Sequence, residues 1–241
     1  MIYKRFSVNS KLSAKFVFLF ILCGIFSSVS NASLMLDSTR YIYSGDKNSL
    51  SGLISNESDS EMGAQIWIEN ADSNDMTPHF ITTPSFFKIG SKQSQVFRAV
   101  SISKDLPKDK ETVFWFNLQE IPQLKPGSGI SIAIRTKVKF IYRPVSLVEG
   151  RKGAEANISL EHANGKTWLV NTTPYIFAIG NVIDNKGDKV TFSQRDTDKL
   201  SMFLPGEKVN VTGFDVKTVF ALNDYGNLES FNIKAKRSSY G

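Results

Sequence analysis

Cysteine and histidine are almost absent from this sequence. Its 241 residues include one cysteine, Cys23, and two histidines, His79 and His162. A single cysteine excludes an intrachain disulfide, and so few soft ligands make a poor set for zinc. The sequence contains no G-x-S-x-G motif, and neither histidine lies in a plausible triad context. We therefore predict a protein that is not an enzyme and that has no metal, no cofactor and no small-molecule substrate.

Long apolar runs are also scarce. The run at residues 16–26, FVFLFILCGIF, has 11 residues, whereas a membrane-spanning helix needs about 20. Four basic and no acidic residues precede it, and the small residues Ser30 and Ala32 follow it. This pattern predicts a secretory signal peptide over residues 1–32 with cleavage after Ala32. A lipoprotein signal ending before Cys23 is the less favoured alternative, because Leu22 stands where a small residue is expected.

Removal of this leader changes the charge balance. The leader holds four of the 29 basic residues and none of the 23 acidic ones, so the net charge falls from +6 to +2. Such a small excess gives no support to nucleic-acid binding. The remaining 209 residues contain no cysteine, so the folded protein depends on its hydrophobic core alone.

The apolar segments of the remaining chain are short and rich in branched and aromatic residues. Turn-forming clusters such as NESDSE and KPGSG separate them, and no window shows a sustained helical period. Seven segments in the first half are expected to be strands: 34–43, 49–55, 63–69, 79–89, 94–102, 112–118 and 130–142. This number and spacing predict an immunoglobulin-like sandwich.

A second β-domain is expected after Arg143-Pro144, where the pattern loosens into a polar stretch containing GRKG. We predict a first domain over residues 33–147 and a smaller one over residues 148–241. The expected strands of the smaller domain are 157–163, 166–171, 175–184, 189–193, 199–204, 208–214, 219–224 and 229–235. Hairpin turns are expected at 184–189 and 223–227.

Three isoleucines stand two residues apart in the stretch GISIAIRTKVKFIYRP: Ile130, Ile132 and Ile134. Side chains at period two line one face of a strand. That face could belong to the protein's own core, as in most half-buried strands, or it could be offered to another protein. Alternation alone favours the first interpretation.

Several motifs occur together in a characteristic order: LDSTRYIY, KDKETVFWFNLQEIP, TKVKFIYRP, NTTPYIFAIG, MFLPGEKV and ALNDYG. In this combination the chain resembles the periplasmic pilus-assembly chaperones of the chaperone–usher pathway, the PapD-like family, over essentially all of residues 33–241. The resemblance implies an all-β protein with two immunoglobulin-like sandwich domains in an L-shape, located in the periplasm.

The resemblance also implies partners. Such chaperones bind, fold and cap pilin subunits by donor-strand complementation, and they deliver them to an outer-membrane usher. The resemblance also changes the interpretation of Ile130, Ile132 and Ile134. It implies that they form the donor strand offered to a pilin and do not face the protein's own core. An exposed apolar strand could also be covered by self-association into a homo-oligomer, but the sequence leaves the oligomeric state of the free chaperone open.

Further residues are assigned by the resemblance. Arg40 and Lys139 correspond to the pair that holds the pilin's C-terminal carboxylate. Ile134 and Lys139 are five apart, so strict alternation puts them on opposite faces, and the sequence leaves open whether a bulge brings the lysine into the cleft.

Four more positions are implied to be structural. Glu111, Arg143 and Asp224 correspond to a charged trio that links the two domains, and the bond before Pro84 corresponds to a cis peptide. From the residues alone, each charge could equally be a separate surface charge.

Two alternatives remain. The first is a pilin or adhesin subunit, favoured only by the alternating residues near the end of the chain. The second is a carbohydrate-binding β-sandwich, which requires an exposed aromatic platform. Trp67, Trp115 and Trp168 lie within apolar strand patterns, and we expect all three in the core.

Overall fold

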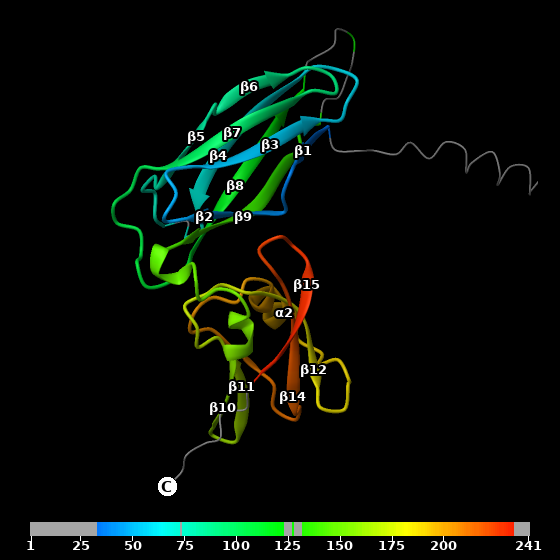
Figure 1. Cartoon of the computed structure of the whole chain (residues 1–241). Coiled ribbons are helices and arrows are strands. Elements are labelled where there is room, and N and C mark those ends of the chain that lie inside the picture. The colour runs from blue at the N-terminus through cyan, green and yellow to red at the C-terminus, as the bar shows by residue number, and fades with distance from the viewer. Residues whose placement is uncertain (1–32, 73, 123–126, 128–131, 234–241) are drawn as a thin grey trace, which may run out of the picture. The chain divides into compact units, whose positions relative to one another are not determined.

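The structure is a computed structural model that describes residues 33–72, 74–122, 127 and 132–233. Within these residues the chain forms two β-sandwiches, one from strands β1 to β9 and the other from strands β10 to β15 (Figure 1). The predicted leader lies outside the described residues. No helix of the described part is long and apolar enough to cross a membrane.

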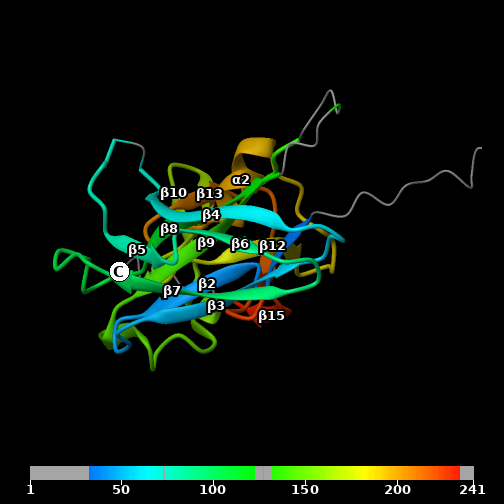
Figure 2. The same ribbon diagram turned by 90° about the horizontal axis from the view of Figure 1, so that it is seen from above.

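The first sandwich consists of two sheets. The five-stranded sheet has the order β2 (Arg40–Ser44), β9 (Arg135–Arg143), β8 (Thr112–Ile121), β4 (Met62–Asn70) and β6 (Phe86–Ile89). The four-stranded sheet has the order β1 (Leu34–Leu36), β3 (Leu50–Asn56), β7 (Ser94–Ser101) and β5 (Phe80–Thr83). Strands β2 and β9 pair in parallel, and Figure 2 shows them side by side.

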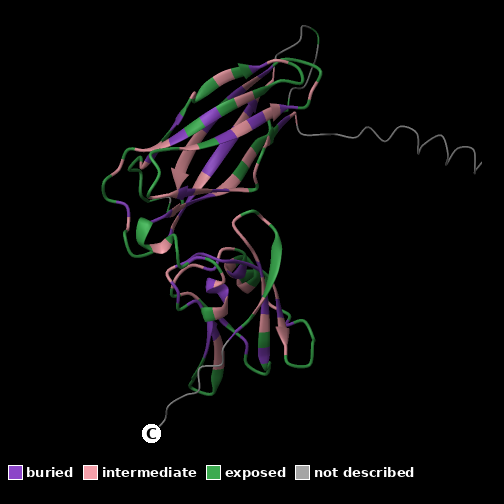
Figure 3. Cartoon of the chain, viewed as in Figure 1, coloured by how far each residue is buried: buried purple, intermediate pink, exposed green. Residues whose placement is uncertain are grey.

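Aromatic side chains fill the space between these two sheets. Phe97 of β7 stacks on Phe116 of β8 with ring centroids 4.7 Å apart, and Tyr41 of β2 meets Phe97 edge-on at 5.4 Å. Along β7, the buried residues Phe97 and Ala99 alternate with more exposed ones, and Figure 3 shows how burial varies along the strands. Period-two alternation therefore specifies which face of each strand enters the core.

The second sandwich has two three-stranded sheets. One has the order β10 (Ser159–Ala163), β11 (Lys166–Val170) and β13 (Lys208–Asn210). The other has the order β12 (Ala178–Asp184), β14 (Val216–Leu222) and β15 (Leu228–Asn232). Its core cluster, from Ala154 to Ile233, shares no residue with the cluster of the first sandwich.

Three short helices occur in the described part of the chain, although none was expected. They are the 3-10 helices η1 (Val145–Leu147) and η2 (Ala154–Asn157) and the α-helix α2 (Gln194–Ser201). The strands expected at 189–193 and 199–204 are therefore wrong, since α2 occupies the centre of this region. Ser193 caps α2 by accepting the backbone N–H of Asp196, which is a helix start that apolar alternation does not reveal.

The strand expected over residues 130–142 is shorter than predicted. Strand β9 begins at Arg135, and the described residues 132–134 precede it without strand structure. The backbone N–H of Glu120 donates to the carbonyl of Ile134 at 2.9 Å, and β8 ends one residue later at Ile121.

Candidate functional site

The described isoleucines of the predicted donor strand are exposed to solvent. Ile132 is 74% exposed and Ile134 is 39% exposed. Ile130 lies outside the described residues. Ile134 has the same parity as Phe140, which is fully buried in the core of the first sandwich. The isoleucines thus continue the inward face of β9 to a point where this protein supplies no core to cover them.

No bulge interrupts β9. Its pairing with β8 keeps a constant register from Arg135 opposite Gln119 to Tyr142 opposite Thr112. Lys139 therefore lies on the face opposite to Ile134. This arrangement answers the question that the sequence left open, because no bulge turns Lys139 to the face of Ile134.

Arg40 and Lys139 are direct neighbours across the parallel β2–β9 pair, although 99 positions separate them in the sequence. The Lys139 ammonium donates to the backbone carbonyl of Ser201, at the end of α2. Arg40 makes no ion pair with any described residue, and its Nε is buried without a hydrogen-bond partner in that part of the chain. Two partly buried cations are thus neighbours here, and no carboxylate of the described residues forms an ion pair with either.

The pKa values of this pair are lowered mainly by burial, with a smaller contribution from nearby cations. Burial and the charge of Arg40 lower the pKa of Lys139 to about 8. Burial also lowers the pKa of Arg40, against the attraction of Asp224 and together with the repulsion of Arg151. An added anion would relieve both effects, because it favours the charged form of each side chain.

The predicted charged trio forms one connected group. Arg143 Nε donates to Glu111 Oε1 at 2.5 Å, and its two Nη atoms donate to the Asp224 carboxylate at 2.7 and 2.9 Å. Glu111 also accepts the backbone N–H of Ile176 at 2.7 Å. Glu111 and Arg143 belong to the first sandwich, whereas Asp224 follows β14 of the second, so the trio joins them.

Burial and ion pairing act in opposite directions on these groups. Burial raises the pKa of Glu111 despite the charge of Arg143. For Asp224, burial is outweighed by the hydrogen bonds and charge of Arg143, so the pKa of this carboxyl is lowered. The guanidinium of Arg143 has a raised pKa, since its bonds to Asp224 and the charge of Glu111 outweigh burial.

Sequence reasoning missed two members of this group. Arg151, only 8% exposed, lies 2.8 Å from Glu155 and 3.7 Å from Asp224. Glu155 is 1% exposed. The sequence pattern indicates a polar linker at GRKG, but the arginine of this stretch is buried in the network. The spacing of four between Arg151 and Glu155 was the available signal.

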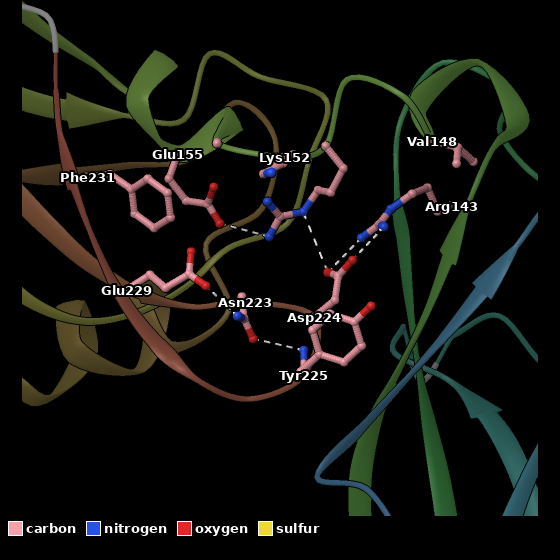
Figure 4. Close-up of a pocket in the computed structure, with 11 residues that line it drawn as sticks. Arg143, Val148, Lys152, Glu155, Asn223, Asp224, Tyr225, Glu229 and Phe231 are labelled. Carbon is pink, nitrogen blue, oxygen red and sulfur yellow. Dashed lines mark hydrogen bonds and ion pairs between the residues drawn. The ribbon is translucent and has the colours of Figure 1, made fainter.

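A cavity of about 420 Å³ adjoins this network (Figure 4). Arg143 and Asp224 form its wall on one side, and Glu155 and Phe231 lie on another. Tyr225 is at its mouth and is 88% exposed. The charged groups of the wall bind one another, as the dashed lines of Figure 4 mark.

The expectation that the three tryptophans are in the core is wrong. All three are half-buried, and each has a cation over its ring: Arg135 over Trp67 at 4.8 Å, Lys137 over Trp115 at 4.7 Å and Lys208 over Trp168 at 5.0 Å. They lie on outer faces, where the charged groups of the basic side chains lie over their rings. No bare aromatic platform for a sugar results from these three residues.

Two further sequence expectations concern local geometry and metals. The Thr83–Pro84 peptide bond, between β5 and β6, is cis. Among the described residues, no group of three or more His, Cys, Asp or Glu side chains could hold a metal ion.

Comparison with known proteins identifies the family. Residues 33–148 match the family described as "Pili and flagellar-assembly chaperone, PapD N-terminal domain". Chaperone protein FaeE of Escherichia coli is 50% identical over 208 residues, which cover 86% of this chain and 80% of that protein.

Solved structures share the two-domain fold. The periplasmic chaperone SfaE matches with a TM-score of 0.67 and 27% identity over 84% of this chain and all of that chain. The SafB chaperone of Salmonella enterica, solved in complex with the SafA pilin, matches with a TM-score of 0.66 and 22% identity over 85% of this chain and 97% of that chain. With two immunoglobulin-like sandwiches and half of the 208 aligned residues identical to those of a known pilus chaperone, the chain belongs to the PapD-like family of pilus-assembly chaperones, which are not enzymes.

Proposed function

We propose that this chaperone binds, folds and caps pilin subunits in the periplasm by lending them a donor strand, and that it then delivers them to an outer-membrane usher. The observation that carries the proposal is the exposure of Ile132 and Ile134 at the root of β9, beside a cation pair that lacks a bound carboxylate. Ile130 would extend the same row. We assign residues 33–147 to the pilin-binding domain and residues 148–241 to a supporting domain.

The isoleucines supply the apolar part of the interaction. An incomplete pilin sandwich exposes a hydrophobic groove and two open strand edges. Branched side chains at period two fit such a groove, and full burial of each contributes about 1.5–3 kcal/mol before binding costs. Exposed isoleucines have no comparable stabilising role in the free chaperone, which supports their use in an intermolecular contact.

Arg40 and Lys139 supply the polar part. A pilin C-terminal carboxylate between them would receive charge-assisted hydrogen bonds from both. It would also occupy a place where burial disfavours both charges and where neighbouring cations add to this effect, Arg40 acting on Lys139 and Arg151 acting on Arg40. Because Lys139 lies in β9 and the isoleucines directly precede this strand, the anchored tail would fix which pilin pocket faces which isoleucine.

The test is a pilin-binding titration. Arg40→Ala and Lys139→Ala should each weaken binding at least tenfold, since a charge-assisted hydrogen bond contributes about 1.5–3 kcal/mol. Lys137→Ala is the matched control: its cation projects from the same face of β9, but it pairs with Glu69 at 2.7 Å. A pilin shortened by a few C-terminal residues should bind wild-type chaperone as weakly as the intact pilin binds the variants.

The donor row is tested separately with Ile134→Asp. The substitution changes a side chain outside the core, so the free energy of unfolding should stay within about 0.5 kcal/mol of wild type while pilin binding is lost. Unchanged affinity in Arg40→Ala, Lys139→Ala and Ile134→Asp would contradict the proposal. Binding of soluble sugars without any pilin would instead favour a carbohydrate-binding protein.

A further inference from the structure

Glu120 is a buried carboxylate that the proposed pilin site does not use. It is 3% exposed, on the inward face of β8 at the end of the first sandwich. Its Oε1 accepts the backbone N–H of Leu34 at 2.8 Å. No Lys, Arg or His nitrogen of the described residues lies within 4.0 Å of this carboxylate. A buried carboxylate without a cation is costly, so its partner needs to be identified.

Nearby charged side chains do not serve this purpose. The loops that adjoin the same end of the sandwich carry both signs, but Lys88 pairs with Glu61 at 3.2 Å and Lys92 with Asp59 at 3.3 Å. These four side chains are more exposed than Glu120 and pair with one another. The cation that Glu120 lacks is therefore not supplied by a described side chain of these loops.

The backbone next to Glu120 offers a cation once the leader is removed. Cleavage after Ala32 would turn the Ser33 nitrogen into an ammonium group. Nitrogens of consecutive residues are at most about 3.6 Å apart, and the Leu34 nitrogen is already bound to Glu120. Ser33 itself is held in place, because its carbonyl accepts the backbone N–H of Glu57 at 2.8 Å.

We propose that Glu120 is the acceptor for the new α-ammonium group of Ser33, so that leader removal completes a buried ion pair at the root of the donor segment. Glu120 has a second connection that gives this pair a consequence. Its backbone N–H donates to Ile134, the last described isoleucine of the donor row. The ion pair would thus link the first residue of the processed chain to β8 at the position where β8 binds Ile134.

The proposal ties pilin binding to export. In the uncleaved chain the Ser33 nitrogen is a neutral amide, so Glu120 has no adjacent cation and the end of β8 is less stable. In the processed chain the same carboxylate binds both the Leu34 N–H and the Ser33 ammonium. This inference rests on the predicted cleavage after Ala32 and extends the proposed function, but its main readout needs no pilin.

The experiment is a four-protein cycle at pH 7, measured by urea unfolding. The chain that begins at Ser33 is compared with one that carries Gly-Ser before Ser33, each with Glu120 and with Glu120→Gln. Glutamine keeps an acceptor for the Leu34 N–H and removes the charge. The extension should lower the folding equilibrium constant about tenfold when Glu120 is present, and less than twofold in the Glu120→Gln background, because only the carboxylate pairs with the ammonium.

A second measurement does not depend on how well the variants fold. The α-amino group of the chain that begins at Ser33 should titrate about one pH unit above its ordinary range of about 7.7–8.0 in NMR. Because its folded pKa is raised, the stabilisation should be complete below about pH 7.7 and lost as the pH rises through the raised pKa.

Three results would overturn the inference. They are an equal effect of the extension in both backgrounds, an α-amino group with an ordinary pKa, and an exported chain whose mass shows a first residue other than Ser33. If the four-protein cycle gives the expected stabilities but the processed protein does not bind pilin, the proposed function is contradicted and the inference about Glu120 is not.

Discussion

Lys139 is held next to another cation in a partly buried place, and this is the feature of single residues with the clearest consequence. Its pKa is lowered to about 8 by burial and by the charge of Arg40. The free chaperone therefore begins to lose this charge within the range of ordinary buffers. A carboxylate bound at this position would require the protonated form.

We predict that pilin binding weakens as the pH rises through 8. Near pH 7 Lys139 is charged, whereas at pH 9 about nine-tenths of the free chaperone carries the neutral amine, so the apparent affinity should be about tenfold lower at pH 9 than at pH 7. Binding titrations across this range test it. Lys139→Arg is the control, because guanidinium does not deprotonate there, and its affinity should be flat with pH. An equally steep decline in that variant would exclude Lys139 as the titrating group.

At the scale of elements, alternation predicted most strands of both sandwiches but not α2. Only one residue of this helix, Leu200, is buried, so no apolar stripe at helical spacing marks it. Its start depends on a polar contact instead: the Ser193 side chain accepts the N–H of Asp196 at 3.2 Å. The end of α2 then presents the Ser201 carbonyl to Lys139.

Removal of this cap should destabilise the protein measurably. Ser193→Ala should lower the free energy of unfolding by about 1 kcal/mol, because the first turn of α2 loses an acceptor for one of its free N–H groups. Arg195→Ala, at an exposed position in the same helix, should change it by less than about 0.5 kcal/mol. Urea denaturation of the three proteins provides the comparison, and equal stability of Ser193→Ala and wild type would show that the cap is not needed.

At the scale of the whole molecule, a chain of buried charges joins the two sandwiches. Glu111 and Arg143 are brought together with Asp224, which lies 81 residues further along the chain than Arg143. Arg151 and Glu155 extend the chain into the second sandwich. Such buried ionic contacts depend on every partner being present.

Arg143→Ala should therefore be strongly destabilising, by about 3–5 kcal/mol, since it leaves the Glu111 carboxylate buried beside no cation of its own. Lys88→Ala removes an exposed ion pair with Glu61 and should cost less than about 1 kcal/mol. Equilibrium unfolding at pH 7 distinguishes the two. Similar values for both variants would mean that the buried network contributes no more than a surface pair.

The sequence by itself determined the features that depend on neighbouring residues. Alternation and turn clusters specified an all-β chain with two sandwiches, and the spacing of Ile132 and Ile134 specified a shared face. These patterns are readable because a strand repeats every two residues whatever surrounds it. The same local rule placed the tryptophans wrongly in the core, because alternation does not say which of two faces meets the other sheet.

Only the tertiary structure decided which distant groups meet. It brought Arg40 beside Lys139, Arg151 into the charged network and the buried Glu120 carboxylate to the N–H of Leu34. These contacts join residues that are far apart in the sequence, so no local period encodes them. Their charges are significant because folding removes them from water, and burial is a property of the packed molecule rather than of any segment.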